Sequence, residues 1–331
     1  MEKQYIALAY YLFVLLEDPF AEVKKHKKFF ESRDCTGRIY ISEEGINGQM
    51  SGALSDTEAY MAWLKEDPRF SKIQFKTHPS AEHVFPRMSV KYREQLVAID
   101  QKIDVSEGGE HVSPEKWKEM LESGKYLLLD VRNRYEWEIG HFEGAVLPPL
   151  ETFREFPEYA EKFKSEVDPA NIKVMMYCTG GIRCELYSAI LKKKGFDHVY
   201  QLDGGVINYG LQEGSTHWKG KLFVFDDRMA VSIDGKESEP IASCIHCKSK
   251  SDMHYNCANM DCNELFICCL SCLEMYKGCC SFACKEAPRV RPFDAKAGNK
   301  PFRRKHLIES TAVSCSLPNS EGDSESPESQ A

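Results

Sequence analysis

Hydrophobic and polar positions along the first hundred residues alternate between the two-residue period of strands and the longer period of helices. The apolar run over 5–15 predicts a buried strand, and residues 20–30, with their lysines on one side, predict an amphipathic helix. Glycine and asparagine are frequent from Glu44 to Gly48, so this segment is expected to form a turn. The other elements expected here are strands over 37–41, directly after 48, over 72–76 and over 89–99, and a helix over 57–65.

The order of these elements resembles a ferredoxin-like α+β sandwich. We therefore expect residues 1–103 to form a ferredoxin-like α+β domain. The polar segment that follows contains Gly108 and Gly109 and has the composition of a linker.

The next block, residues 112–220, has the pattern of an α/β domain with a parallel sheet. Ser113 is a favoured N-cap residue and Pro114 is favoured at the first helical position. A helix is therefore expected to begin there and to run to about Glu122.

Strands inside this block are expected where apolar residues are continuous, because strands buried on both faces lose the polar alternation. Such runs occupy 126–131 and 172–177, and a helix over 185–194, capped by Gly195, and a strand over 199–202 follow. The loop after the second run thus lies at the carboxyl end of a strand, where open parallel sheets place their sites.

The last third of the chain is expected to contain a hairpin over 221–233 and a cysteine-rich metal-binding module. We assign residues 221–308 to this module and its basic extension. Residues 309–331 are rich in serine, proline and acidic residues, so they are expected to be a disordered acidic tail.

The net charge of −8 at pH 7 is distributed unevenly along the chain. Five acidic residues and no lysine or arginine fall within 309–331, so the rest of the chain has a net charge of about −3. Residues 285–308 hold eight lysines and arginines against two acidic residues. The overall sign therefore conceals a local basic patch.

Fourteen cysteines are present, and ten of them lie between Cys244 and Cys284. The apolar run near the N-terminus lacks the flanking residues of a secretory signal, which argues against a disulfide scaffold. Metal binding in a reducing compartment explains the cysteines better, and a cytoplasmic location is expected. No stretch reaches the roughly 20 apolar residues of a membrane helix, so no membrane partner is expected.

Cys178 begins the loop Cys178-Thr-Gly-Gly-Ile-Arg183 between a predicted strand and a predicted helix. Backbone N–H groups curve around such a loop and the helix N-terminus adds partial positive charge, which together stabilise a thiolate. The two glycines let the backbone fold close to the sulfur, and Arg183 offers a hydrogen-bonding fork to an anionic substrate group. A single buried cysteine is commonly an inert small hydrophobe, but this combination indicates a nucleophile.

Several motifs resemble those of the rhodanese family. Leu129–Asn133 with Glu136, the turn Gly140-His-Phe142 and the strand end Leu202–Gly205 match its signature, and Cys178–Arg183 matches its six-residue active loop. The resemblance implies that Cys178 carries a persulfide. It also implies that Asp130 orders the loop and that His141 makes structural hydrogen bonds.

Two further segments, Gly37–Ile41 leading into Glu44–Gly48 and the continuation of the loop into Cys184-Glu185, narrow the resemblance to bacterial rhodanese-domain tRNA uridine(34) hydroxylases. The similarity covers roughly residues 5–305. It implies oxygen-dependent conversion of the wobble uridine of the anticodon to 5-hydroxyuridine, with Cys178 as the catalytic cysteine and Arg183 shaping its loop.

Cys184 has two interpretations at this point. It either resolves an oxidised or persulfidated Cys178, or it is a small residue packed under the first helical turn. Molecular oxygen is the implied co-substrate, and no flavin or nicotinamide motif is seen in the sequence.

Four close cysteine pairs follow one another in the cysteine-rich module. Two such pairs complete one tetrahedral S4 site, so two structural zinc ions are expected. The spacing leaves the pairing open, but an interleaved arrangement, in which the first and third pairs share one ion and the second and fourth the other, is favoured over consecutive pairing. Cys268, Cys279, His246 and His254 stay open as alternative ligands. The four pairs are Cys244 and Cys247, Cys257 and Cys262, Cys269 and Cys272, and Cys280 and Cys284.

Basic residues with interleaved phenylalanines follow these pairs and are expected to track an RNA backbone and stack on bases, although they fit a solvated tail equally well. The family resemblance, and not this patch, implies the anticodon region of tRNA as the partner. No DNA partner is expected. The basic residues are Arg289, Arg291, Arg303, Arg304 and Lys305.

Two other functions stay open. A sulfurtransferase that passes persulfide sulfur to an acceptor needs only the rhodanese loop, whereas the additional domains at both ends favour a large substrate. A zinc-organised interaction module on an inactive rhodanese scaffold is disfavoured because Cys178 is present.

Overall fold

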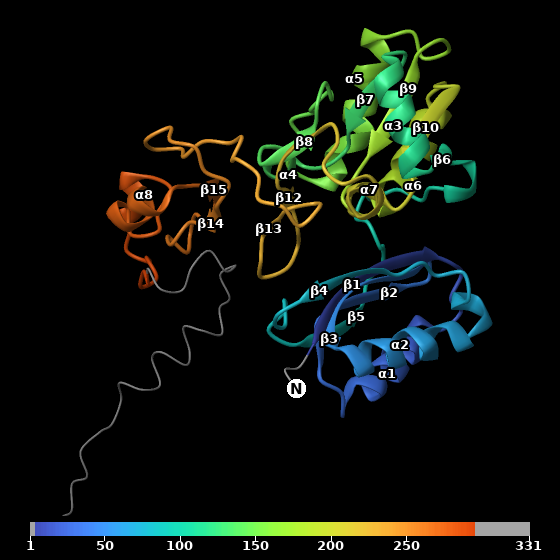
Figure 1. Ribbon diagram of the computed structural model, residues 1–331, viewed down its shortest axis with the longest axis horizontal. Coiled ribbons are helices and arrows are strands. Elements are labelled where there is room, and N and C mark those ends of the chain that lie inside the picture. Colours follow the sequence, from blue (N-terminus) through green and yellow to red (C-terminus); the bar gives the residue numbers. More distant parts are fainter. Residues whose placement is uncertain (1–3, 295–331) are drawn as a thin grey trace, which may run out of the picture.

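The computed structural model of the protein describes residues 4–294, and three regions follow one another along this part of the chain (Figure 1). The predictions for Arg303, Arg304, Lys305 and the acidic tail lie outside the described residues. No helix among residues 4–294 is long and apolar enough to span a membrane.

The N-terminal region is a five-stranded sheet in the order β4-β1-β3-β2-β5, with two helices on one face (Figure 1). β1 pairs antiparallel with β3 and β4, and β5 is added parallel to β2. The order βαββαβ with this arrangement confirms the ferredoxin-like fold. The elements are β1 (Tyr5–Phe13), α1 (Pro19–Phe30), β2 (Cys35–Ser42), β3 (Gly45–Ala53), α2 (Leu54–Glu66), η1 (Pro68–Phe70), β4 (Lys76–Ser80) and β5 (Met88–Tyr92).

The turn predicted over Glu44–Gly48 extends too far, because only Glu44 of this segment lies in the turn and β3 begins at Gly45, where it pairs with β1 and β2. Gly48 lies opposite Tyr10, and the Tyr10 ring fills the space that a side chain at position 48 would need. A Cβ on Gly48 would be 2.1 Å from Cζ of the ring. The glycine therefore makes room for a cross-strand aromatic ring and does not mark a turn.

Two other strand boundaries also differ from the prediction. The strand expected over 72–76 begins only at Lys76, and the one expected over 89–99 ends at Tyr92. Leu96, Val97 and Ile99 are nevertheless buried. Their apolar run belongs to a connecting segment that packs against the next domain, which periodicity alone does not distinguish from a strand.

The second region contains a four-stranded sheet in the order β6-β10-β9-β7, and all neighbouring strands are parallel. This confirms the predicted rhodanese-type α/β fold. As predicted, Ser113 caps its first helix, accepting a hydrogen bond from the N–H of Lys116. The elements are η2 (Val105–Glu107), β6 (Glu110–Val112), α3 (Pro114–Ser123), β7 (Leu127–Asp130), α4 (Arg134–Trp137), β8 (Gly140–Phe142), η3 (Phe153–Glu155), α5 (Phe156–Glu166), β9 (Lys173–Tyr177), α6 (Ile182–Lys193), β10 (His198–Leu202) and α7 (Gly205–Glu213).

Strand β9 is buried on both faces, which explains its continuous apolar sequence. Val174 and Met176 belong to one core with Phe156 and other residues of α5 and α6. Met175 and Tyr177 belong to a second core on the other side of the sheet. The residue that follows β9 is therefore held by two packed layers.

The third region starts with short strands and continues into a small cysteine-rich unit. The predicted hairpin is present as β12 paired with β13, and β11 pairs with β8 of the second region. The buried core of the unit includes Cys244, Cys257, Cys268, Cys272 and Cys279. The elements are β11 (Trp218–Gly220), β12 (Leu222–Phe223), β13 (Ala230–Val231), β14 (His254–Asn256), β15 (Leu265–Ile267), α8 (Leu270–Met275) and α9 (Phe282–Lys285).

Candidate functional site

Cys178 lies between the end of β9 and the start of α6, in a buried loop. The N–H of Gly181 donates to Cys178 Sγ at 3.1 Å. Gly181 has φ of +102°, and a Cβ there would be 2.7 Å from the Tyr11 hydroxyl. Glycine is thus required both by the backbone conformation and by the close approach of β1.

The loop stabilises the thiolate of Cys178. Burial by itself raises the pKa of this thiol, but a hydrogen bond from the Cys184 side chain, the charge of Arg183 and the backbone N–H groups of residues 183 and 184 lower it to about 5. These groups lie at the N-terminus of α6, where helices favour negative charge. Cys178 is therefore predominantly a thiolate at neutral pH.

Cys184 lies in the first turn of α6 and is fully buried. Burial and the adjacent negative Cys178 raise the pKa of the Cys184 thiol well above its ordinary value. Its side chain stays protonated and hydrogen-bonds to Cys178. The two sulfurs of the loop thus have opposite protonation states.

Arg183 holds the loop to the rest of the domain through a salt bridge with Glu136. Its Nη1 and Nη2 donate to the two Glu136 carboxylate oxygens at 2.6 and 2.8 Å, and Thr179 Oγ1 donates to Glu136 at 3.2 Å. Both terminal nitrogens are therefore used inside the protein. The expectation that Arg183 offers a free hydrogen-bonding fork to a substrate was wrong, because Nη1 and Nη2 both donate to Glu136.

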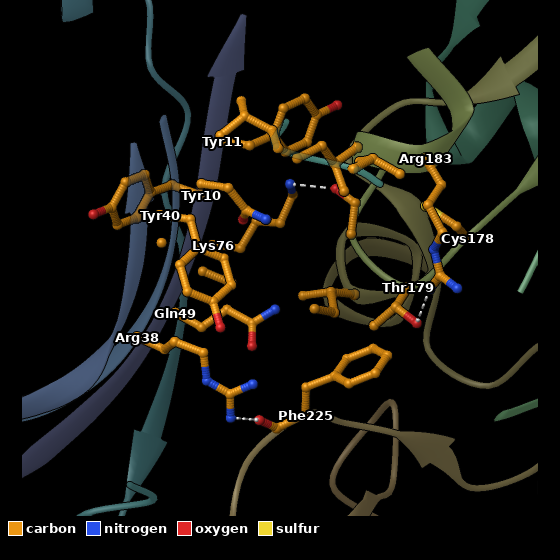
Figure 2. A pocket seen from close by; sticks show the side chains of 18 of the residues that line it. Tyr10, Tyr11, Arg38, Tyr40, Gln49, Lys76, Cys178, Thr179, Arg183 and Phe225 are labelled. Carbon is orange, nitrogen blue, oxygen red and sulfur yellow. Dashed lines mark hydrogen bonds between the residues drawn. The ribbon is translucent and has the colours of Figure 1, made fainter. Parts of the chain in front are cut away.

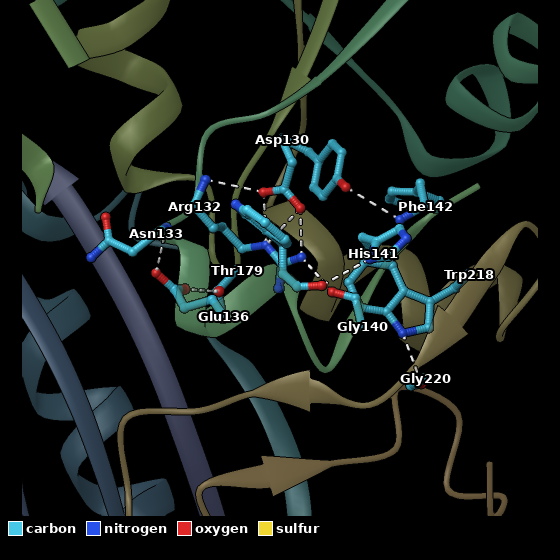
Figure 3. A network of polar contacts seen from close by, with 12 residues as sticks. Asp130, Arg132, Asn133, Glu136, Gly140, His141, Phe142, Thr179, Trp218 and Gly220 are labelled. Atoms are coloured by element: carbon cyan, nitrogen blue, oxygen red, sulfur yellow. Dashed lines mark hydrogen bonds and ion pairs between the residues drawn. The ribbon is translucent and has the colours of Figure 1, made fainter. Parts of the chain in front are cut away.

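Asp130 and His141 have structural partners (Figure 3). The Asp130 carboxylate accepts from Arg132 Nε at 2.9 Å and Nη2 at 2.6 Å, and Arg132 Nη2 also donates to the Gly140 carbonyl at 2.6 Å. His141 Nδ1 hydrogen-bonds to the Trp137 carbonyl at 2.8 Å. These bonds fasten the strand end and the following turn together, as the family motif implied.

Strands of the N-terminal region lie against the cysteine loop (Figure 2). Lys76 Nζ, on β4, donates to the Gly180 carbonyl at 2.8 Å and lies 5.1 Å from the centre of the Tyr11 ring. Burial lowers the pKa of Lys76 to about 8, so the ammonium form still predominates at neutral pH. A cation from one domain therefore contacts the reactive loop of another.

Glu185 makes a second connection between these domains. Its Oε1 accepts a hydrogen bond from the Tyr11 hydroxyl at 2.8 Å, and its Oε2 lies 3.2 Å from His111 Nε2. Hydrogen bonds to Asp203 and Glu185 raise the pKa of His111 to about 10. His111 is therefore cationic at neutral pH and offsets the charge of both carboxylates.

A cavity of about 210 Å³ lies between the cysteine loop and the N-terminal sheet (Figure 2). Cys178, Thr179 and Arg183 line it from the rhodanese side, and Asn47 and Gln49 of β3 line it from the other. The side-chain amides of these two residues make no hydrogen bond within residues 4–294. The cavity thus offers polar groups that are available to a ligand.

A larger cavity of about 640 Å³ adjoins the first and shares Gln49, Lys76 and Thr179 with it. Its other walls include the hairpin β12–β13 and residues of α7. The space around the cysteine loop is therefore bordered by all three regions of the chain.

The cysteine pairs come together as two groups of four that could each hold a metal ion. The first group joins the first and third pairs, and the second joins the second and fourth, so both are interleaved. Within each group the ligand atoms all lie within 4.8 Å of one another. The groups are Cys244, Cys247, Cys269 and Cys272, and Cys257, Cys262, Cys280 and Cys284.

Sulfur separations in these groups fit a tetrahedral thiolate site. The Sγ atoms of Cys247 and Cys269 are 3.6 Å apart, and those of Cys262 and Cys280 are 3.7 Å apart. Zn–S bonds of about 2.3 Å in a tetrahedron place sulfurs roughly 3.8 Å apart, whereas a disulfide bond is only about 2.05 Å long. Cys268 and Cys279 are buried outside both groups.

Arg289 and Arg291 are the members of the predicted basic extension that lie within the described residues. Arg289 Nη1 forms an ion pair with Asp261 at 2.6 Å. Arg291 is half-buried and its guanidinium hydrogen-bonds to the Asn256 carbonyl. Both side chains thus brace the cysteine-rich unit.

Sequence reasoning did not identify Lys76, Asn47 or Gln49. The signal for the two amides was present, because polar residues at 47 and 49 alternate with buried Ile46, Gly48 and Met50, as in a half-buried strand. No local signal marks Lys76, since its role depends on the docking of two domains.

Comparisons with known proteins cover almost the whole described chain. Family models match at residues 5–96 (UPF0176 acylphosphatase like domain), 113–210 (Rhodanese-like domain) and 219–285 (Rhodanase C-terminal). Three similar relatives each have the name tRNA uridine(34) hydroxylase. They come from Chlamydia trachomatis serovar L2 (59 % identity, 96 % of this chain and 98 % of the relative), Chlamydia pneumoniae (57 %, 96 % and 100 %) and Protochlamydia amoebophila (56 %, 92 % and 96 %).

Proposed function

The chain belongs to the family of tRNA uridine(34) hydroxylases, and from this we propose that it hydroxylates the wobble uridine of tRNA, in the anticodon, to 5-hydroxyuridine. Molecular oxygen is the proposed source of the new hydroxyl oxygen. The proposed place of reaction is the cytoplasm, where tRNA and reduced thiols are both present.

The observation that supports this proposal most strongly is the cavity in front of Cys178, which lies between the N-terminal sheet and the cysteine loop. Its 210 Å³ is below the roughly 300–1,000 Å³ of pockets for drug-sized ligands. A single base turned out of its stack fits this scale better than a whole nucleotide does. Enzymes that modify a base generally receive it in such an enclosed pocket.

Cys178 is the proposed catalytic residue, and a persulfide on its sulfur is the proposed reactive form. A thiolate is the form that accepts sulfur or attacks an electrophile, and the loop supplies it at neutral pH. Arg183 acts as a positioning residue, because its salt bridge with Glu136 holds the loop. Cys184 is the proposed proton donor and resolving partner, since its protonated thiol adjoins Cys178.

The two groups of four cysteines are proposed to hold one zinc ion each, in structural sites. All four positions are filled by thiolates, whereas a catalytic zinc keeps one position for water or substrate. Bound zinc would supply cross-links for a unit whose core consists largely of cysteine. The basic extension is proposed to contact the tRNA backbone through Arg303, Arg304 and Lys305.

The direct test is nucleoside analysis by mass spectrometry of tRNA from cells that lack their own uridine(34) hydroxylase. Expression of the wild-type chain should restore 5-hydroxyuridine, and expression of Cys178→Ser should not. Restoration by Cys178→Ser to the wild-type level would refute the proposed role of the cysteine, and no product with the wild type would refute the proposed reaction.

A plain sulfurtransferase would need the rhodanese loop but no base-sized cavity formed with another domain. In this chain Lys76, Tyr11 and Glu185 attach the N-terminal sheet directly to the loop. The thiolate at Cys178 also argues against an inactive scaffold. Both features favour chemistry on a large substrate.

A further inference from the structure

The N-terminal sheet has two very different faces. One is apolar and packs under α1 and α2, with Leu8, Ile39 and Met50 in the core. The other is turned toward the rhodanese region, and no helix of the N-terminal region covers it (Figure 1). The strands must therefore present polar side chains there in a regular array.

Strand register places these side chains in two rows. In the first row Gln49 lies opposite Ala9 and Arg38, and Lys76 lies beyond Ala9. In the second row Asn47 lies opposite Tyr11 and Tyr40, and Lys91 lies beyond Tyr40. We call Arg38, Tyr40, Asn47, Gln49 and Lys91 the polar sheet face.

The groups on this face match the chemistry of an unstacked pyrimidine. An amide side chain offers both a donor and an acceptor. Gln49 points into the cavity (Figure 2) and Asn47 lines it, and neither side-chain amide has a hydrogen-bond partner in residues 4–294. Tyr40, in the same wall, offers an aromatic surface. Single-stranded RNA is commonly bound on a sheet face by stacking and by hydrogen bonds to base edges.

Positive charge is placed at the margin of this face, as a nucleic-acid backbone requires. Lys91 and Arg93 are exposed, and the Arg93 guanidinium lies over the Tyr40 ring at 4.8 Å from its centre. Arg38 lines the cavity and uses one nitrogen to donate to the Phe225 carbonyl at 3.1 Å. The cations therefore surround the aromatic and amide groups.

We propose that the polar sheet face is the RNA-binding half of the active site. Tyr40 stacks on a base of the anticodon loop, Asn47 and Gln49 hydrogen-bond the edge of the uracil in front of Cys178, and Lys91 neutralises phosphate. This inference rests on the proposed function and deepens it, because it identifies the surface that holds the substrate.

Binding of a fluorescent anticodon stem-loop RNA to the full chain, measured by anisotropy at fixed salt, tests the proposal. Tyr40→Ala should weaken binding roughly 5- to 150-fold, which is the effect of losing one base–aromatic stack. Tyr40→Phe should bind within about twofold of the wild type, since stacking does not require the hydroxyl. Gln49→Leu should lower both binding and product.

Tyr92→Ala is the matched control. Tyr92 lies in β5 of the same sheet, but it pairs with Ile41 of the opposite face and stacks on Phe20 with ring centres 4.4 Å apart. Its removal should leave RNA binding within about twofold of the wild type. Circular dichroism and thermal unfolding of each variant identify any loss of fold.

Three results would overturn the inference: wild-type binding by folded Tyr40→Ala, an equal loss in Tyr92→Ala, or equal affinity for a duplex that has the same stem and no loop. The proposed function is tested separately, by Cys178→Ser. If the wild type forms 5-hydroxyuridine and Cys178→Ser does not, while Tyr40→Ala and Gln49→Leu bind and react normally, only the inference fails.

Discussion

Alkylation of Cys178 by iodoacetamide should reach its maximal rate well below neutral pH. The loop lowers the pKa of this thiol to about 5, through the hydrogen bond from Cys184, the charge of Arg183 and the backbone N–H groups, which together outweigh burial. The thiolate is the reacting species. The rate should therefore rise with pH up to about 6 and change little above it.

The pH at which the alkylation rate levels off is more informative than the rate itself. At pH 6.5 a thiol with a pKa near 5 is about 97 % thiolate, whereas an ordinary thiol with a pKa of about 8.5 is about 1 % thiolate. The less basic thiolate is also a weaker nucleophile, by roughly 40-fold for a slope of about 0.45. These two effects leave a net advantage of only roughly two- to threefold, so the pH profile has to be measured.

Mass spectrometry of tryptic peptides can follow the two cysteines of the loop independently. Cleavage after Arg183 separates Cys178 from Cys184. Because the pKa of Cys184 is raised, its peptide should stay unlabelled at pH 6.5 in the folded protein and serve as the internal control. A labelling rate at Cys178 that keeps rising through pH 8 would refute the description of the loop.

Other features of the site lead to equally direct expectations. Glu136→Ala should lower the free energy of unfolding in urea by about 3–5 kcal/mol, because it leaves the buried Arg183 charge unpaired; a loss below about 1 kcal/mol would contradict this. Lys76→Met should move the alkylation midpoint of Cys178 upward, since it removes a nearby positive charge; an unchanged midpoint would count against that coupling. Elemental analysis should find two zinc ions per wild-type chain and about one in Cys272→Ser, whereas loss of neither ion would disprove the ligand assignment.

The cysteine loop could be predicted from the sequence because all of its determinants are contiguous. A strand, two glycines and an arginine within six residues specify the conformation and the charge around Cys178. The cysteine pairs could be predicted for the same reason, since two ligands on one tight turn must be close in the chain. Motifs of this kind can be recognised from the sequence whatever the arrangement of the domains.

The cavity could not be predicted, because its walls come from distant parts of the chain. Lys76 meets the Gly180 carbonyl across 104 positions, and Tyr11 meets Glu185 across 174. Asn47 was missed for a different reason: the glycines around it suggested a turn, whereas Gly48 only makes room for Tyr10. The composition of this segment is typical of a turn, whereas its alternation of buried and half-buried residues is that of a strand.

The complete burial of Cys178 bears on how long a reactive sulfur survives in the cell. A persulfide on an open loop would exchange with any abundant small thiol and lose its sulfur before a slow, bulky substrate arrived. The N-terminal sheet lies over the loop, so a small thiol has to enter a cavity lined by amides and an aromatic ring to reach Cys178. For the proposed persulfide form of Cys178, the docked domain would thus act as a kinetic shield that makes the lifetime of the sulfur less dependent on the small thiols around the protein.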